Sequence, residues 1–283
     1  MQYRILGKTG LKVSAVGFGG IPIQRIDARG TRALMERLVE KGVNYIDTAR
    51  GYTVSESYLG EALSGGLREK FILATKSMSR GYADMARDIG ISLSNLRTDY
   101  IDLYQLHNIK SDADFELAFS AEGAVAAIQD AIRAGKVGHL GATAHSVDSF
   151  ERLLSYPEIE TIMFPYNIVE SQGEALMERA AAQNVGVIAM KPLAGGNITD
   201  GTLAMRYILQ NKTCTLAIPG MATLEEIEQN TAAAEQDGPL TPEELAACEA
   251  IRAGLSGNFC RRCGYCAPCT VGIDIPGIFT LEN

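Results

Sequence analysis

The chain has 283 residues, of which 46% are hydrophobic and 21% are charged, and its formal net charge at pH 7 is -8. This much apolar material can bury a large core, which excludes a long disordered tract. The acidic balance argues against nucleic-acid partners and anionic membrane surfaces, because both need clustered Lys and Arg. The N-terminus lacks an apolar signal core and no apolar run is long enough to span a membrane, so we expect a cytoplasmic protein.

The first predicted element is a β-hairpin, in which the segments YRIL and LKVS flank the turn GKTG. Short apolar runs that are typical of buried parallel strands then recur along the chain. There are eight such runs, at 15–20, 44–49, 71–76, 100–107, 138–145, 161–167, 186–192 and 214–220. Stretches with helical periodicity lie between them, for example at 30–42, 55–66, 122–136 and 173–184.

Eight alternations of strand and helix over about 250 residues predict an α/β protein with a (β/α)8 TIM barrel, whose floor the hairpin would cap. A doubly wound open sheet is the alternative, but the first strand-to-helix turn, GFGGIP, does not fit the G-x-G-x-x-G fingerprint. An extra helix is expected at 241–255, with Thr241 as N-cap and Glu244 completing a capping box. We therefore divide the chain into a barrel with this helix, 1–255, and a Cys-rich tail, 256–283.

Four titratable side chains follow the expected strand ends, where a barrel of this kind carries its chemistry. Asp47 ends the second strand, Tyr52 follows in the next loop, and Lys76 and His107 end the third and fourth strands. Taken singly, each has a purely structural interpretation, such as an ion pair between Asp47 and Lys76. Considered together, the four residues have a chemical interpretation. The ammonium of Lys76 beside the phenol of Tyr52 can stabilise the phenolate and lower the pKa of the phenol. The set could then protonate an alkoxide as it forms from a carbonyl, with His107 bonded to the substrate oxygen.

The segments YIDTARGY, ILATK and IDLYQLH resemble the catalytic segments of the aldo-keto reductases, a barrel family that reduces aldehydes and ketones with a nicotinamide dinucleotide. The resemblance covers about residues 1–235. It implies a catalytic tetrad of Asp47, Tyr52, Lys76 and His107, in which Tyr52 is the general acid and NADPH or NADH delivers hydride. A small carbonyl compound is the implied substrate.

The resemblance also implies a set of cofactor-binding residues. Tyr166 would stack on the nicotinamide, Thr143 and His145 would hold its carboxamide, and the loop KPLAGG at 191–196 would lie along the pyrophosphate. In that loop, Gly195 and Gly196 would let backbone amides approach phosphate oxygens. The full implied set is Gly20, Asp47, Thr143, His145, Tyr166, Lys191, Pro192, Leu193, Gly195, Gly196, Pro219, Gly220, Met221, Glu226, Gln229 and Asn230.

The segment GMATLEEIEQN at 220–230 departs from the family's pocket for a 2′-phosphate. Gly220 and Met221 stand where the family pattern has Lys-Ser, and Glu226 stands where it has an Arg. A carboxylate in place of a bidentate Arg substitutes repulsion for a charge-assisted bond. Either the enzyme prefers NADH, or it holds NADPH by other contacts.

Four closely spaced cysteines, Cys260, Cys263, Cys266 and Cys269, predict a metal site in the tail. Zinc sites usually set two C-x2-C pairs a dozen or more residues apart, whereas successive C-x2-C steps are typical of a loop around a 4Fe-4S cluster. This spacing favours the cluster and leaves zinc as the alternative. The tail also resembles those of an iron–sulfur branch of the aldo-keto reductases. Cys214 and Cys248 are expected to be buried thiols.

Two functions remain open from the sequence. The first is a carbonyl reductase whose cluster is a structural clip or an electron relay to a redox partner protein. The second is a catalytically weak module that binds nucleotide and cluster and senses redox state or transfers electrons. The complete tetrad favours the first, because a binding module has no need of Tyr52 beside a Lys–Asp pair.

Overall fold

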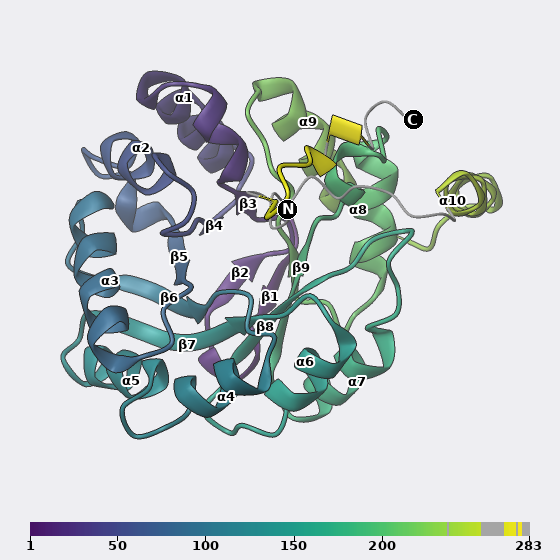
Figure 1. The fold of residues 1–283 in the computed structure, drawn as a ribbon. Coiled ribbons are helices and arrows are strands. Elements are labelled where there is room, and N and C mark those ends of the chain that lie inside the picture. The colour runs from purple at the N-terminus through teal and green to yellow at the C-terminus, as the bar shows by residue number, and fades with distance from the viewer. Residues whose placement is uncertain (237, 256–268, 276, 279–283) are drawn as a thin grey trace.

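The computed structural model describes residues 1–236, 238–255, 269–275 and 277–278 (Figure 1). In this part of the chain, eight parallel strands pair in the order of the sequence, from β3 to β10. The strands are β3 (Phe18–Gly19), β4 (Tyr45–Asp47), β5 (Ile72–Ser77), β6 (Ile101–Leu106), β7 (Val137–Thr143), β8 (Thr161–Pro165), β9 (Gly186–Met190) and β10 (Leu216–Ala217). Each overlaps one of the predicted apolar runs.

The sheet closes on itself, which confirms the barrel and excludes the open doubly wound sheet. Parallel bridges join Val16 to Ala217 and Gly19 to Gly220, and the amide of Gly19 donates to the carbonyl of Pro219 at 2.9 Å. Chain segments at the first and last strands are thus hydrogen-bonded to each other.

The helices form a ring around the strands, and α10 stands outside that ring beside α8 (Figure 1). Side-chain caps stabilise the starts of six of these described helices; for example, Asp27 accepts a hydrogen bond from the amide of Gly30 at the start of α1. Their bounds are α1 (Ala28–Glu40), α2 (Ser55–Ala62), α3 (Tyr82–Asn95), α4 (Asp112–Ala118), α5 (Ala124–Arg133), α6 (Val147–Leu153), α7 (Glu174–Ala182), α8 (Gly201–Gln210), α9 (Leu224–Ala232) and α10 (Pro242–Gly254). None of these described helices is both long and apolar enough to cross a membrane.

The N-terminal hairpin closes one end of the barrel, as predicted. Strands β1 (Tyr3–Ile5) and β2 (Lys12–Ser14) pair antiparallel. Leu6 and Val13 are fully buried in the same apolar cluster as inward-facing strand residues. Because the hairpin seals the end where the strands begin, the chemistry is left to the opposite end.

Helix α10 begins with the predicted capping box, since Thr241 and Glu244 exchange side-chain and backbone hydrogen bonds. The helix packs against α8 through Cys248, which is buried, and Cys214 is fully buried in the outer layer of the core. Both thiols therefore lie in the core, as expected. The division into a barrel, 1–255, and a tail, 256–283, stays a prediction, because most of the tail lies outside the described residues.

Candidate active site

The centre of the site is an ion pair inside the barrel, at the ends of β4 and β5. Lys76 Nζ donates to Asp47 Oδ2 and to the carbonyl oxygen of Thr48, the latter at 2.8 Å. The side chains of Lys76 and Asp47 are only 2% and 3% exposed. Charges buried this deeply are tolerated only when they are paired and hydrogen-bonded.

Gln105 completes this pair, and the sequence analysis missed it. Its amide Nε2 donates to Asp47 Oδ1 at 3.1 Å, and its backbone lies beside Lys76 in the register of β5 and β6. Gln105 precedes His107 by two residues, so strand alternation places both on the inner face. That spacing was a usable signal in the sequence.

Tyr52 and His107 lie next to the ion pair. Lys76 Nζ is 4.9 Å from the centroid of the Tyr52 ring, and the rings of Tyr52 and His107 meet edge to face with centroids 6.0 Å apart. The structure thus brings all four residues of the predicted tetrad together.

His107 is a neutral imidazole at physiological pH. Burial lowers the pKa of His107 to about 2, and the nearby charges of Lys76, His145 and Arg80 act in the same direction. A neutral imidazole still carries one N–H that can donate a hydrogen bond. It therefore suits contact with an oxygen without competing for the proton.

Tyr52 keeps its proton more firmly than the sequence suggested. Burial and then the carboxylate of Asp47 raise the pKa of Tyr52 above its ordinary value of 10.0. The expectation of a lowered pKa for Tyr52 is wrong for this state of the protein, because burial and the charge of Asp47 dominate. The pKa of Asp47 is itself raised by burial, with Lys76 and Gln105 partly offsetting the rise.

The loop after β9 has the backbone that a phosphate cradle requires. Gly195 and Gly196 have φ angles of 73° and 97°, in the left-handed region that favours glycine, and Lys191 also has a positive φ of 55°. Asn167 anchors the loop, since its side chain donates to the carbonyl of Lys191 at 3.0 Å. Leu193 is half-buried and Pro192 is buried.

Asn230 presents a second feature that fits a bound nucleotide. The residue is 2% exposed, and its Nδ2 donates to the carbonyl of Glu226 at 2.8 Å. Within the described residues its Oδ1 accepts no hydrogen bond and faces Gly201 at the start of α8. A buried acceptor of this kind fits a ligand N–H, while its neighbour Gln229 is exposed.

Other predicted residues line the strand ends. Gly20 packs against the carbonyl of Asp47, and Gly220 against Pro22, where an added Cβ would come within 2.9 Å and 2.7 Å of its nearest neighbours. Thr143 Oγ1 accepts from the amide of Asn108 at 2.7 Å and keeps its own O–H to donate. His145 is close enough to His107 to influence the pKa of His107. The carbonyl of Pro219 accepts a hydrogen bond from the amide of Gly19 in β3.

Comparison with known proteins identifies the family. The model of the aldo/keto reductase family matches residues 15–202, which is more than half of the chain. The chain belongs to the aldo-keto reductases. It is an oxidoreductase of a family that uses NAD(P)H and acts on small carbonyl substrates.

Relatives of this reductase match most of its length. L-galactose dehydrogenase from Arabidopsis thaliana is 28% identical, over 89% of this chain and 94% of that protein. The aldo-keto reductase YhdN from Bacillus subtilis is 26% identical, over 74% of this chain and 67% of that protein. The structure resembles the holo form of aldo-keto reductase AKR11C1 from Bacillus halodurans, with a TM-score of 0.78, 26% identity, and 89% and 96% of the two chains covered.

Tyr166 is held by contacts on the outer side of the barrel wall. Its hydroxyl donates to Glu174 at 2.7 Å and accepts from Asn211 at 3.2 Å, and its ring is buried in the outer core. Met163 faces the barrel interior, so alternation turns a residue three positions later outward. These contacts disfavour the expected stacking of Tyr166 on a nicotinamide, which stays a prediction. Met190, which faces inward at the end of β9, is a candidate for that contact that sequence reasoning missed.

The two remaining residues of the predicted phosphate pocket have structural roles. Met221 is fully buried in the outer core, so its side chain is not presented to a ligand. Glu226 Oε2 accepts from the amides of Ala222 and Thr223, at 2.6 and 3.1 Å, and forms the capping box of α9. The start of that helix therefore already holds a carboxylate, which disfavours an added phosphate.

Three of the four predicted metal ligands, Cys260, Cys263 and Cys266, lie outside the described residues. Cys269 is half-buried, and backbone amides, first those of Val271 and Ile273, lower its pKa. Among the described residues, no group of three or more His, Cys, Asp or Glu side chains could hold a metal ion. The metal site of the tail accordingly stays a prediction.

The neutral His107 predicts a pH dependence of stability. Unfolded His107 binds a proton below its ordinary pKa of 6.5, whereas folded His107 does so only near 2. Because the folded pKa is depressed, stability is lost as the pH falls below 6.5, by up to ~1.4 kcal/mol per pH unit. Relative to a His107→Gln variant, the wild-type free energy of unfolding should drop by ~2 kcal/mol more between about pH 8 and about pH 5.

Urea unfolding of both proteins at the two pH values measures this difference. Any offset caused by the substitution itself cancels, because only the pH dependence is compared. An equal pH dependence in the two proteins would contradict a buried, neutral His107.

Proposed function

We propose that this reductase transfers hydride from a nicotinamide dinucleotide to an aldehyde or ketone, with Tyr52 as the general acid. The observation that carries the proposal is the phenol of Tyr52 held beside the imidazole of His107 and the buried Asp47–Lys76 pair. Tyr52 is partly exposed to solvent, whereas Asp47, Lys76 and His107 are buried. A substrate oxygen can therefore approach the phenol from the barrel mouth.

Residues at that end of the barrel fit the cofactor. The left-handed glycines Gly195 and Gly196 would receive the pyrophosphate, and the acceptor of Asn230 would receive a base N–H. Thr143 and His145 would hold the carboxamide. When bound, the dinucleotide supplies the hydride.

The residues of the chain supply the proton. Tyr52 O–H donates its proton to the carbonyl oxygen as negative charge develops there, while the N–H of His107 donates a hydrogen bond to the same oxygen. An alkoxide is a stronger base than a phenolate, so the raised pKa of Tyr52 does not prevent this transfer. The phenolate left behind lies beside the ammonium of Lys76, which Asp47 and Gln105 keep in place. Solvent then returns a proton to Tyr52.

NADH is the proposed cofactor. Glu226 lies in the segment that would receive a 2′-phosphate, as part of the capping box of α9, and Glu225 adds a second carboxylate in the same turn. Two carboxylates repel a phosphate dianion.

Tyr52→Phe should lower turnover of a carbonyl substrate by about 10²-fold or more, because it removes the general acid. Nucleotide affinity should change little, since the phenol makes no proposed contact with the dinucleotide. Steady-state assays on a panel of aldehydes, with fluorescence titration of NADH, measure both quantities. Tyr82→Phe, on the surface of α3, is the matched control. Turnover within a few-fold of wild type would remove Tyr52 from the acid role.

Glu226→Arg should shift the ratio of NADPH to NADH affinity towards NADPH by about 1–3 kcal/mol, since a charge-assisted bond replaces a repulsion. The variant also loses a helix cap, which should lower the free energy of unfolding by about 0.5–2 kcal/mol. Glu158→Arg carries the same charge change at the hairpin end of the barrel, where Lys8 donates to the carbonyl of the adjacent Pro157 at 2.7 Å, and is the control. A wild-type preference for NADPH of about a hundredfold would contradict the proposal of NADH.

We further propose that Cys260, Cys263, Cys266 and Cys269 bind one 4Fe-4S cluster, on the strength of their spacing. Anaerobic protein should then contain close to four irons and absorb near roughly 400 nm. A Cys263→Ser variant should lose both signals, while Cys248→Ser should keep them. One zinc and no iron in anaerobic protein would instead make the tail a structural zinc site, and would exclude electron relay or redox sensing through a cluster.

A further inference from the structure

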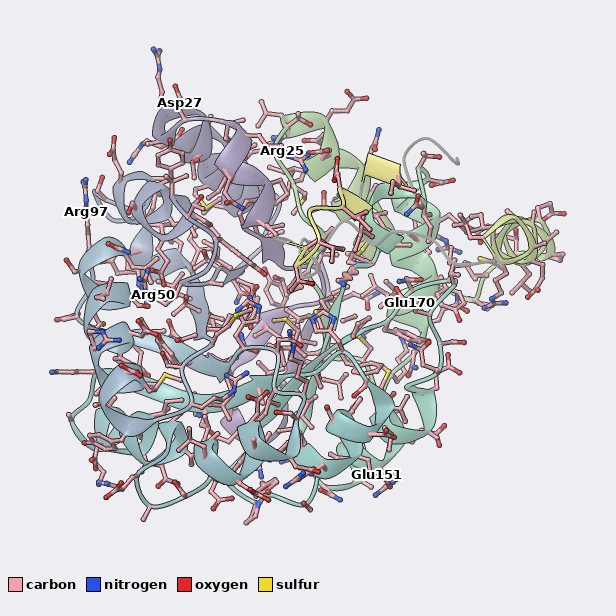
Figure 2. The ribbon with its side chains drawn as sticks, viewed as in Figure 1. Arg25, Asp27, Arg50, Arg97, Glu151 and Glu170 are labelled. Atoms are coloured by element: carbon pink, nitrogen blue, oxygen red, sulfur yellow. The ribbon has the colours of Figure 1, made fainter. Side chains whose placement is uncertain are left out.

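We propose that Arg50, Glu56 and Asp88, the Arg50 cluster, act as positioning residues that fix the loop of Tyr52 against Lys76. The proposal rests on the proposed role of Tyr52 as proton donor. Arg50 lies two residues before Tyr52, on the side of the barrel that α2 and α3 cover (Figure 2). The cluster is therefore outside the barrel wall, while the tetrad is inside it.

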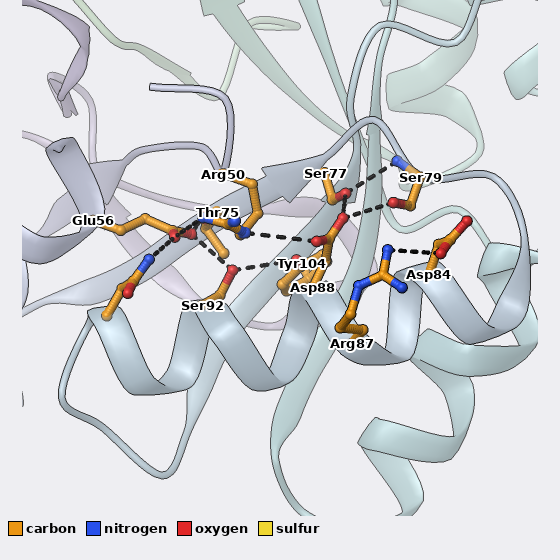
Figure 3. Close-up of polar contacts among 11 residues, drawn as sticks. Arg50, Glu56, Thr75, Ser77, Ser79, Asp84, Arg87, Asp88, Ser92 and Tyr104 are labelled. Carbon is orange, nitrogen blue, oxygen red and sulfur yellow. Dashed lines mark hydrogen bonds and ion pairs between the residues drawn. The ribbon is translucent and has the colours of Figure 1, made fainter. Parts of the chain in front are cut away.

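The carboxylate of Glu56 lies at the centre of the cluster's hydrogen bonds (Figure 3). Its side chain is 2% exposed and accepts four hydrogen bonds. The donors are Arg50 Nη1 at 3.1 Å, Thr75 Oγ1 at 2.8 Å, Ser92 Oγ at 2.7 Å and Asn95 Nδ2 at 3.1 Å. One carboxylate thus joins the Tyr52 loop, strand β5 and helix α3.

Asp88 on α3 binds the end of strand β5 and the residues that follow it. Its Oδ2 accepts from the hydroxyls of Ser77 and Ser79, the latter at 2.6 Å, and its Oδ1 lies 3.7 Å from Arg50 Nε. The guanidinium of Arg50 therefore faces two carboxylates at once (Figure 3). The planar fork of an Arg can serve both, whereas the single ammonium of a Lys cannot.

The cluster binds the two residues of β5 that flank Lys76. Successive strand side chains point to opposite faces, so Thr75 and Ser77 turn outward to the cluster while Lys76 turns inward to Asp47. The backbone amide of Arg50 also donates to the carbonyl of Lys76 at 2.9 Å. The Arg50 cluster thus ties the chain on both sides of Lys76 to the loop that carries Tyr52.

A role in positioning explains why charged groups occupy this place. Buried ion pairs contribute little net stability compared with apolar groups of similar size, because desolvation offsets their attraction. Their geometry, in contrast, is specific. Proton transfer is sensitive to the placement of the donor, and a shift of about 1 Å can cost about 10²-fold in rate.

The test uses Glu56→Gln, which removes the shared charge, and Arg50→Lys, which keeps a charge but not the fork. The matched controls are Asp84→Asn and Arg87→Lys on α3, which alter an exposed ion pair with 2.7 Å between Asp84 Oδ1 and Arg87 Nη2 (Figure 3). We expect kcat for carbonyl reduction to fall by about 10- to 100-fold in the cluster variants. The dissociation constant for NADH should stay within about twofold of wild type, and the controls should match wild type in both quantities.

A second readout does not depend on activity. With 3-fluorotyrosine placed at position 52 alone, the ¹⁹F resonance should shift or broaden in Glu56→Gln and Arg50→Lys but not in the controls. If wild-type protein reduces no carbonyl compound, the proposed function fails and the ¹⁹F comparison still tests the positioning. An unchanged resonance, or a loss of kcat that only follows the fraction of unfolded protein, would overturn it.

Discussion

Asp47 and Lys76 face each other inside the barrel, where neither charge would be tolerated without the other. Gln105 and the carbonyl of Thr48 take up further hydrogen-bonding capacity, so the pair is held in one geometry. Burial and then the charge of Asp47 raise the pKa of Tyr52, so the phenol stays protonated in the resting protein. In the proposed mechanism the same pair acts once that proton has left, since the ammonium of Lys76, 4.9 Å from the centroid of the Tyr52 ring, would then lie beside the phenolate. The protonation of Tyr52 and the pairing of Asp47 with Lys76 thus both depend on burial, and the N-terminal hairpin, which closes the floor of the barrel, contributes to that burial.

Strand β5 connects the candidate site to the surrounding helices, because its two faces make different contacts. Lys76 points inward to the chemistry, while Thr75 and Ser77 point outward to carboxylates on α2 and α3. The helices of this side therefore do more than cover the sheet, because their carboxylates also bind the strand on both sides of Lys76. The opposite side of the barrel, around the loop after β9, supplies backbone amides and left-handed glycines instead. The division matches a site in which protons are handled on one side and phosphates on the other.

Much of the fold was predictable from the sequence, because short apolar runs, helical periodicity and strand-end residues are local signals. The barrel, the hairpin, the extra helix and the proximity of the tetrad all followed from them. Gln105 was within reach by the same alternation. To predict that Tyr166 points outward, one must also know which residues of β8 face the barrel interior. The structure shows that Met163 does. The raised pKa of Tyr52 and the Arg50 cluster depend on burial and on contacts between segments distant in sequence, so no local pattern could supply them. Glu226 was interpreted only as a repulsive charge, although the Thr-x-x-Glu spacing of a capping box was visible.

The claim that the buried pair serves proton transfer rather than stability is tested most directly by the double variant Asp47→Asn/Lys76→Met. Replacing both charges avoids leaving one of them buried alone, so the free energy of unfolding should stay within about 2 kcal/mol of wild type or rise. Single-turnover oxidation of bound NADH by an aldehyde, followed by absorbance, is the deciding measurement. The account predicts a folded protein that binds NADH and transfers hydride at least about 10²-fold more slowly than wild type. Transfer within a few-fold of the wild-type rate would contradict it.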